Sequence, residues 1–242
     1  MIDIFSKESD AQIVHVTHDS AESGLSIVQP INTHAHHSKV FDELGARASD
    51  LLQSNCVIWV EGPSDRIYFN KWLELFDPDL NEHADYEFAF TGGAVLSHFS
   101  YDESSEKDMI EALKINRNAI VLMDKDKAVT LSGLKPHVER VSNEISGNDG
   151  LAWITEGKEV ENYIPIEALR HFLGNLELEI PDPQGNMFEL IKDNGKGDFS
   201  GRKVALAAKI CGLLDSSMLA GCLDLKAKLT DVCNRIRKWN SQ

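Results

Sequence analysis

Long apolar runs, cysteine pairs and an excess of positive charge are all missing from this chain of 242 residues. No apolar run approaches the ~18 residues that a membrane-spanning helix needs. Residues 1–8 lack the basic, apolar and small-residue order of a secretory signal peptide. Four cysteines do not make a disulfide framework in a chain of this length, and no CxxC pair indicates a zinc site. We therefore expect a cytoplasmic protein without membrane partners.

The formal charge is −15, from 24 basic and 39 acidic residues. Proteins that bind nucleic acids usually carry basic patches, and this balance is the opposite. Carboxylates of a metal site would account for part of the excess, because bound cations offset their charge. If the substrate is a nucleic acid, we expect another domain or subunit to bind most of its phosphates.

From residue 55 onward, apolar strand patterns alternate with helical patterns. Such alternation predicts the α/β fold class, a parallel sheet with helices on both faces. After residue 161 the pattern becomes mainly helical, with two breaks between 202 and 239. The predicted elements are strands at 56–60, 86–90, 119–123 and 151–155, and helices at 64–76, around 105–116 and at 134–145.

Acidic residues follow three of these strands, at the end where ligands bind in open parallel sheets. They are Glu61 and Asp65, then Asp124 and Asp126, then Glu159 and Glu161. Carboxylate ligands suit Mg²⁺ or Mn²⁺, and two ions ~3.5–4 Å apart are typical of phosphodiester hydrolysis. A single acid at a strand end could merely favour the start of a helix. Three such groups in one sheet favour a metal site, in which Glu61 could alternatively act as a general acid or base.

The same residues resemble a known family. Residues 60–65 (Val-Glu-Gly-Pro-Ser-Asp), 91–93 (Thr-Gly-Gly) and 122–126 (Leu-Met-Asp-Lys-Asp) look like the Toprim domain of topoisomerases, primases and OLD-family (overcoming lysogenization defect) nucleases. Residues 158–163 (Lys-Glu-Val-Glu-Asn-Tyr) resemble the late acidic motif of the OLD branch. The resemblance covers about residues 51–165. It implies a Toprim-type parallel sheet flanked by helices, with a C-terminal helical extension.

The resemblance also implies roles for the acids, in an enzyme that uses Mg²⁺ or Mn²⁺, with two ions, to hydrolyse nucleic-acid phosphodiesters. Glu61 matches the catalytic glutamate, which is also a metal ligand, and Asp65 matches an acid of the metal shell. Asp124 and Asp126 match a pair of metal ligands. For the later ligand Glu161 is the match, and Glu159 remains the alternative.

OLD nucleases use a lysine beyond the Toprim core to stabilise the charge of the transition state. Lys203 is the best-placed match, with Lys196 and Lys209 as alternatives. A lysine on a solvated helix face is the competing interpretation for each of the three.

The first fifty residues resemble a different part of the same proteins. Residues 15–20 (His-Val-Thr-His-Asp-Ser) look like the switch-histidine strand at the end of an ABC-type ATPase domain. We therefore expect an N-terminal segment at 1–50, a Toprim catalytic core at 51–165 and a helical C-terminal subdomain at 166–242. The chain contains no Gly-x-x-x-x-Gly-Lys-Ser/Thr phosphate loop, so an ABC/AAA-type ATPase would be a partner domain or subunit.

Three functions agree with these residues. The first is a metal-dependent DNA endonuclease, the effector part of an ATPase–Toprim system of the anti-phage type. The second is an effector that cleaves RNA, for example transfer RNA, with the same residues. The third is a non-catalytic Toprim module for regulation or for dimerisation, which the strong negative charge and the missing ATPase favour. A homodimer is also compatible with the sequence.

Overall fold

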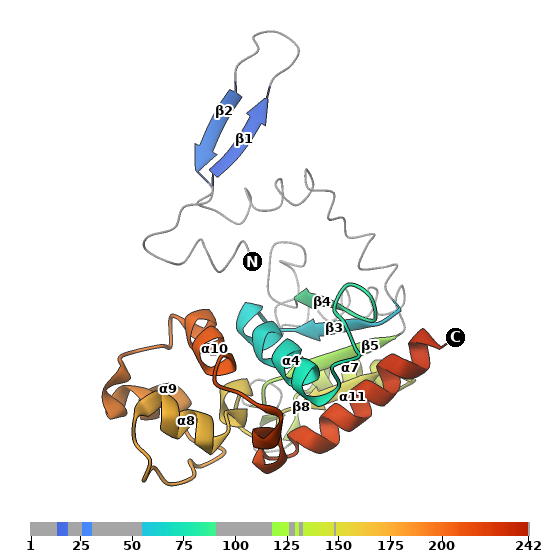
Figure 1. Cartoon of the computed structure of the whole chain (residues 1–242). Helices are drawn as coiled ribbons and strands as arrows, with labels where there is room; N and C mark the ends of the chain where they lie inside the picture. Colours follow the sequence, from blue (N-terminus) through green and yellow to red (C-terminus); the bar gives the residue numbers. More distant parts are fainter. Residues whose placement is uncertain are drawn as a thin grey trace.

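The computed structural model describes residues 55–90, 118–125, 129–130, 133–147 and 149–241, together with the backbone of two strands at 14–18 and 26–30. Its centre is a four-stranded parallel sheet with the strand order β4-β3-β5-β8 (Figure 1). The strands are β3 (Val57–Val60), β4 (Glu87–Phe90), β5 (Ala119–Met123) and β8 (Leu151–Ile154). Because the strands are parallel and paired in register, their carboxyl ends lie at one edge of the sheet.

Successive residues of each strand point to opposite faces of the sheet, and both faces are covered. Ile58 and Leu122 belong to one hydrophobic cluster, whereas Trp59 and Val121 belong to another. All of these side chains are buried, which explains why the strands read as unbroken apolar runs rather than as an alternating pattern.

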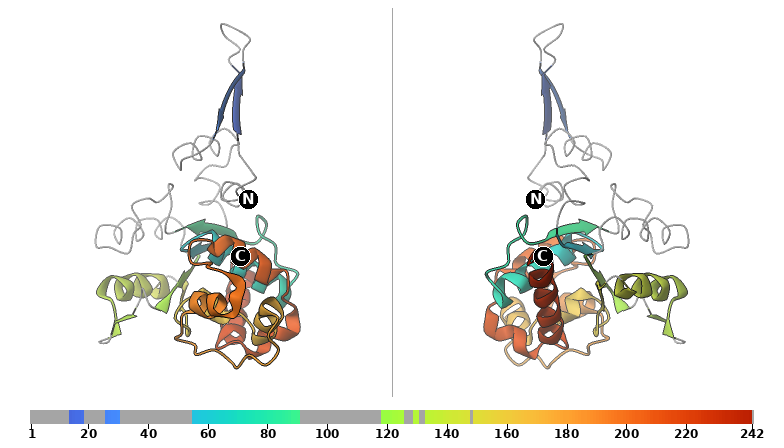
Figure 2. Two further views of the ribbon diagram at one scale, coloured as in Figure 1. Left: turned by 90° about the vertical axis from the view of Figure 1, so that its left-hand side faces the viewer. Right: turned by 90° about the vertical axis from the view of Figure 1, so that its right-hand side faces the viewer.

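Helix α7 (Pro136–Gly147) covers the second of these faces. Its residues Val138, Val141 and Ile145 are buried in the cluster that contains Trp59 and Val121. The views in Figure 2 show α7 on the opposite side of the sheet from α11 (Leu225–Asn240). The sheet is therefore the middle layer of three.

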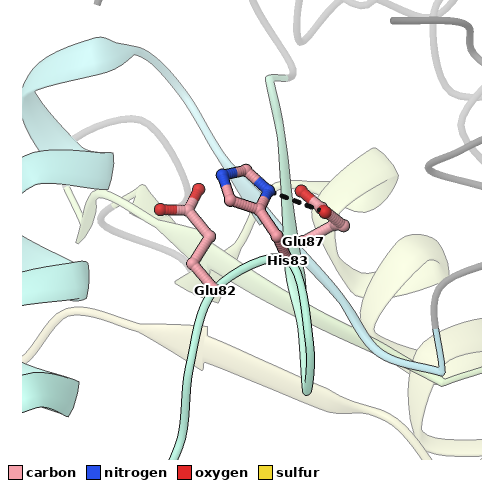
Figure 3. Close-up of side chains that lie close together, drawn as sticks. All are labelled: Glu82, His83 and Glu87. Carbon is pink, nitrogen blue, oxygen red and sulfur yellow. Dashed lines mark hydrogen bonds and ion pairs between the residues drawn. The ribbon is translucent and has the colours of Figure 1, made fainter.

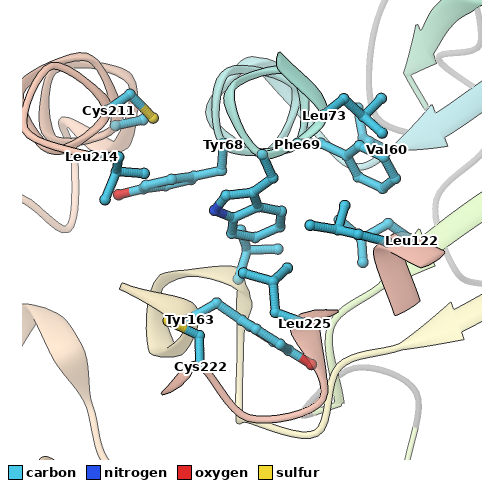
Figure 4. Packing of buried hydrophobic residues seen from close by; sticks show 14 of the residues in the cluster. Val60, Tyr68, Phe69, Leu73, Leu122, Tyr163, Cys211, Leu214, Cys222 and Leu225 are labelled. Atoms are coloured by element: carbon cyan, nitrogen blue, oxygen red, sulfur yellow. The ribbon is translucent and has the colours of Figure 1, made fainter. Parts of the chain in front are cut away.

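Helix α4 (Pro63–Phe76) covers the first face, together with the C-terminal helices. It begins directly after β3, where Pro63 suits the first helical turn. Its aromatic side chains form the centre of the core, and Trp72 packs against Trp153 and Tyr163 with ring centroids 6.1 and 5.7 Å apart. Figure 4 shows how Tyr68, Phe69 and Leu73 extend from α4 into this cluster.

The C-terminal extension is helical and shares this core. Its elements are η1 (Val160–Tyr163), α8 (Ile166–Leu173), α9 (Met187–Ile191), η2 (Lys192–Lys196), α10 (Lys203–Cys211), η3 (Ser216–Gly221) and α11. The two predicted breaks occur at 212–215 and 222–224, on either side of η3. Cys211, Cys222 and Cys233 consequently lie in or beside three separate elements, and all three are buried.

The expected fold class is confirmed: the chain is an α/β protein with a parallel sheet flanked by helices and a C-terminal helical extension. Two further pairs of short strands are antiparallel: β1 (Val14–His18) pairs with β2 (Ser26–Pro30), and β6 (Val129–Thr130) pairs with β7 (Gly133–Leu134). The helix expected around 105–116 and the Thr-Gly-Gly motif at 91–93 lie outside the described residues. Within the described part, no helix combines the length and apolar character that a bilayer crossing requires.

Candidate metal centre

The first two acids lie where strand β3 passes into helix α4. Glu61 directly follows β3, and Asp65 lies in the first turn of α4. The Asp65 carboxylate accepts hydrogen bonds from the Gly62 N–H (3.1 Å) and from the Ser64 hydroxyl (3.2 Å). Burial raises the pKa of Asp65, and the negative charge of Glu61 raises it further. Asp65 thus both supports the helix start and lies in the field of a second carboxylate.

Asp124 directly follows the neighbouring strand, β5, and is 6% exposed. Its Oδ1 accepts a hydrogen bond from the Val160 N–H at 3.0 Å. Burial raises the pKa of Asp124 to about 8, with further contributions from the carboxylates of Asp65, Glu161 and Glu61. These effects require the acids of all three strand ends to lie near one another at the carboxyl edge of the sheet.

Glu159 and Glu161 come from the segment after β8, at the start of η1. Lys203, the first residue of α10, extends its ammonium toward both: Nζ lies 2.9 Å from Glu159 Oε2 and 3.5 Å from Glu161 Oε2. The same ammonium lies 4.9 Å from the centre of the Phe188 ring. Burial lowers the pKa of Lys203, but the charges of Glu161 and Glu159 outweigh it, so that the pKa rises above its usual value.

Glu161 is the most deeply buried of the acids, with 1% of its surface exposed. Neither carboxylate oxygen accepts a hydrogen bond, and its counter-charge is the more distant ion pair with Lys203. Burial raises the pKa of Glu161 to about 7; Lys203 lowers it, whereas Glu159 and Asp65 raise it. A buried carboxylate without a hydrogen-bond donor is costly, unless a cation or a proton neutralises it.

Together these side chains form one group, which we call the acidic centre. It consists of Glu61, Asp65, Asp124, Glu159, Glu161 and Lys203. The group contains five carboxylates and one ammonium, and the two buried oxygens of Glu161 accept no hydrogen bond, so the donor set fits a divalent cation that prefers oxygen ligands. Mg²⁺ and Mn²⁺ are such cations.

Several polar groups that the sequence analysis did not single out hold the strand ends together. The buried Thr155 hydroxyl accepts a hydrogen bond from the Lys125 N–H (2.9 Å) and donates one to the Gly157 carbonyl (2.8 Å). It therefore ties the residue after Asp124 to the loop that leads to Glu159. A buried threonine at the end of a strand carries no distinctive sequence signal, so only the tertiary contacts identify it.

The loop between β8 and η1 is also packed too closely for any residue larger than glycine at 157. A Cβ at this position would lie 2.7 Å from the Asn162 Cβ and 3.1 Å from Leu223 Cδ1. The Asn162 side chain accepts from the Glu159 N–H and donates to the Gly185 carbonyl, both at 3.0 Å. The position of Glu159 and Glu161 is thus set by contacts with later parts of the chain.

Some predicted site residues lie elsewhere or outside the described residues. Asp126 is not among the described residues, and neither are the side chains of the β1 strand. Lys209 is exposed in the last turn of α10, and Lys196 lies over the Phe172 ring at 5.9 Å. Of the three candidate lysines, Lys203 is the one that contacts the acidic centre.

A second group of ligand atoms lies at the opposite edge of the sheet, at the start of β4 and in the segment before it. Ligand atoms of Glu82, His83 and Glu87 lie within 4.8 Å of one another. Figure 3 shows the imidazole between the two carboxylates, with His83 Nδ1 2.8 Å from Glu87 Oε1. Glu82 already forms an ion pair with Arg66 at 2.6 Å. The sequence analysis did not select these residues, although a histidine flanked by two glutamates within six positions was the available signal.

Comparisons with known proteins found similar solved structures but no matching family. No protein-family model and no curated protein matches the chain. Three structures of the C-terminal region of the Xanthomonas campestris pv. campestris OLD protein, phased with iodine, mercury and platinum, are similar to it, with TM-scores of 0.47, 0.45 and 0.46 and identities of 14%, 15% and 15%. The matches cover 78%, 77% and 78% of this chain and 99%, 96% and 95% of those chains. At such identities and TM-scores the likeness carries no argument about function, which is argued from the side chains of this chain.

Proposed function

We propose that this chain is a divalent-metal-dependent nuclease that hydrolyses phosphodiester bonds of DNA at the acidic centre. The observation that supports this most strongly is the environment of Glu161, whose buried oxygens accept no hydrogen bond. A protein that only needed a stable core would be expected to avoid such a group, because its burial costs free energy. A site that binds cations requires it.

The ligands of the ions would come from all three strand ends. Asp124 uses Oδ1 to accept from Val160, which leaves Oδ2 for a cation. Glu61, Asp65 and Glu161 lie in the same field of negative charge. Asp126 is proposed as a further ligand from its sequence position alone. When bound, two divalent ions supply positive charge beside the phosphate and favour deprotonation of water.

Glu159 and Lys203 are proposed to act as a pair. Glu159 holds the ammonium of Lys203 at 2.9 Å, so Glu159 positions the lysine and is the weaker candidate for a metal ligand. Lys203 keeps its proton at neutral pH because the neighbouring carboxylates raise its pKa. A fixed ammonium beside the reacting phosphate stabilises the negative charge that develops there.

The wider role that we propose is the effector part of an ATPase–Toprim system of the anti-phage type. It is supported by the resemblance of residues 15–20 to the end of an ATPase domain. An RNA substrate requires the same residues at the centre, so the choice between DNA and RNA is left to the experiment.

Cleavage of supercoiled plasmid in the presence of Mn²⁺ tests the proposal. We expect nicked or linear product from the wild-type chain, none with EDTA, and at least a hundredfold loss, about 3 kcal/mol, in Asp124→Asn and Glu161→Gln. Asp231→Asn, which removes an exposed acid on α11, is the matched control and should cleave normally. A parallel digest of transfer RNA identifies the substrate class. Cleavage that survives in both variants would show that the acidic centre is not the active site.

A further inference from the structure

A segment rich in positive charge leads along the chain to Lys203 of the acidic centre, although the chain as a whole is strongly negative. Residues 192–203, here called the basic loop, join α9 to α10 and include η2. They contain four cations, Lys192, Lys196, Arg202 and Lys203, against two acids, Asp193 and Asp198. The last of these cations belongs to the acidic centre, so the other three have no role in the function proposed above.

Two of these cations lie over aromatic rings. Lys196 Nζ lies 5.9 Å from the centre of the Phe172 ring, and Arg202 Cζ lies 4.8 Å from that of Phe199. The two rings pack edge to face at 6.0 Å. Contact with an aromatic face attracts a cation and restricts its side chain without neutralising its charge.

Most of the other arginines whose side chains the structure describes are neutralised by carboxylates. Arg66, Arg235 and Arg237 form ion pairs, whereas Arg170, like Arg202, donates to a backbone carbonyl, that of Leu178. Arg202 donates from Nε (3.1 Å) and Nη2 (2.7 Å) to the Asp198 carbonyl, and among the described residues it forms no ion pair. Its Nη1 donors remain for another acceptor.

The backbone presents Lys196 at the surface. The lysine lies between Gly195 and Gly197, whose φ values are 79° and 81°. Only glycine adopts this left-handed conformation readily, so the sequence builds the turn that exposes Lys196. Phe199 is buried beneath Arg202, which leaves a charged rather than an aromatic surface for a ligand.

Arg202 directly precedes Lys203, and consecutive Cα atoms are about 3.8 Å apart. A ligand that contacts Arg202 therefore reaches the acidic centre within the length of one or two side chains. In Figure 1, α8, α9 and α10 lie together on one side of the sheet. Since the carboxylates of the centre repel phosphates, a polyanion needs nearby cations to approach it.

We propose that Lys196 and Arg202 of the basic loop bind backbone phosphates of the nucleic-acid strand that enters the acidic centre. This proposal rests on the nuclease function and names the surface that holds its substrate. The contacts are to phosphates, so binding through them is independent of base sequence. This chain then supplies part of the phosphate binding that its net charge had suggested must come from another domain.

The test measures binding of a fluorescein-labelled DNA strand of about 20 nucleotides by anisotropy, in EDTA so that cleavage is excluded, between ~50 and ~200 mM salt. In the double variant K196A/R202A we expect about tenfold weaker binding at the lower salt concentration. The slope of log K against log salt should fall by ~1.4, because each phosphate contact of a single strand contributes ~0.7. An RNA strand of the same sequence should show the same change.

Two control variants separate charge at this surface from charge in general and from folding. K226A/K228A removes two positive charges from α11 and should leave the slope unchanged. K196R/R202K keeps both charges and should keep most of the affinity. Three results would each overturn the proposal. The salt slopes of K196A/R202A and the wild type could be equal, the two double-alanine variants could lose equal affinity, or the wild type could bind neither strand.

The same variants distinguish this proposal from the nuclease function. If the wild type does not cleave plasmid in Mn²⁺ but K196A/R202A still lowers the salt slope, the nuclease function fails and the binding surface stands. If the wild type cleaves and the slope is unaffected, the nuclease function stands and the role of the basic loop is refuted.

Discussion

Replacing Asp124 by asparagine should stabilise the protein without metal and abolish its stabilisation by metal. The substitution preserves shape, and the amide oxygen can still accept the hydrogen bond from Val160. It removes a charge whose burial raises the pKa of Asp124 from 3.8 to about 8. The difference of about four pKa units corresponds to a ceiling of about 6 kcal/mol, at 1.36 kcal/mol for each unit.

The sign of the pH dependence follows from proton binding. A carboxyl whose pKa is raised by folding binds more protons in the folded than in the unfolded state. Below about pH 4 both states are protonated, and the stability of the metal-free protein is then lost as the pH rises from about 4 to about 8. Glu161, with a pKa raised to about 7, contributes a loss in the same direction. Asp124→Asn should remove the part of this pH-dependent loss of stability that is due to Asp124.

The assay is urea unfolding in EDTA at about pH 5 and about pH 8.5, repeated with Mn²⁺ at the higher pH. The wild type should be less stable at the higher pH and should recover with Mn²⁺. Asp124→Asn should lose less stability between the two pH values, because only the part that Glu161 contributes remains, and Mn²⁺ should restore little of it. Asp231→Asn, on the exposed surface of α11, controls for the loss of one negative charge and should behave as the wild type. A metal-free wild type that is equally stable at both pH values would refute the argument from buried charge.

Three further substitutions test the groups around the centre. Lys203→Met leaves buried Glu161 without its ammonium and should destabilise the metal-free protein by about 2–3 kcal/mol in urea unfolding. Lys209→Met, at the exposed end of the same helix, is the control and should leave the stability unchanged. Thr155→Val removes the hydroxyl that joins Lys125 to Gly157. It should lower the free energy of unfolding by about 1–3 kcal/mol and weaken Mn²⁺ binding in calorimetry, whereas Thr155→Ser, which keeps the hydroxyl, should retain the stability and the binding. Gly157→Ala places a Cβ 2.7 Å from that of Asn162, so it should lower the thermal midpoint and reduce the free energy of unfolding by about 1–3 kcal/mol. In Gly221→Ala the added carbon meets nothing within 4 Å, so the thermal midpoint should not fall.

Much of the fold could be read from the sequence because the sheet is covered on both faces. The run Ala119–Met123 is apolar throughout and forms β5 at the predicted bounds. The helix predicted at 134–145 begins and ends two residues later, at Pro136 and Gly147, because the ends of helices depend on local capping more than on apolar periodicity. The roles of the site residues remain predictions, including that of Asp126, which lies outside the described residues.

The candidate site also contains residues that the sequence could predict and residues that it could not. The strand-end acids Glu61 and Asp124 could be predicted to approach each other, because parallel strands end at one edge. The resemblance placed Lys203 ahead of Lys196 and Lys209 but did not exclude them, because three lysines in one stretch of chain look alike until their neighbours are known. Only Lys203 of the three lies within ion-pair distance of Glu159 and Glu161.

By itself the sequence determined the layered α/β architecture and the acids at the ends of its strands, because apolar periodicity and strand direction are local properties of the chain. The tertiary structure alone decided that Glu161 is buried without a hydrogen bond while Glu159 is paired, and that Lys196 and Arg202 lie over aromatic rings. Burial, charge pairing and ring contacts join residues that are distant in sequence, and only the folded chain brings them together.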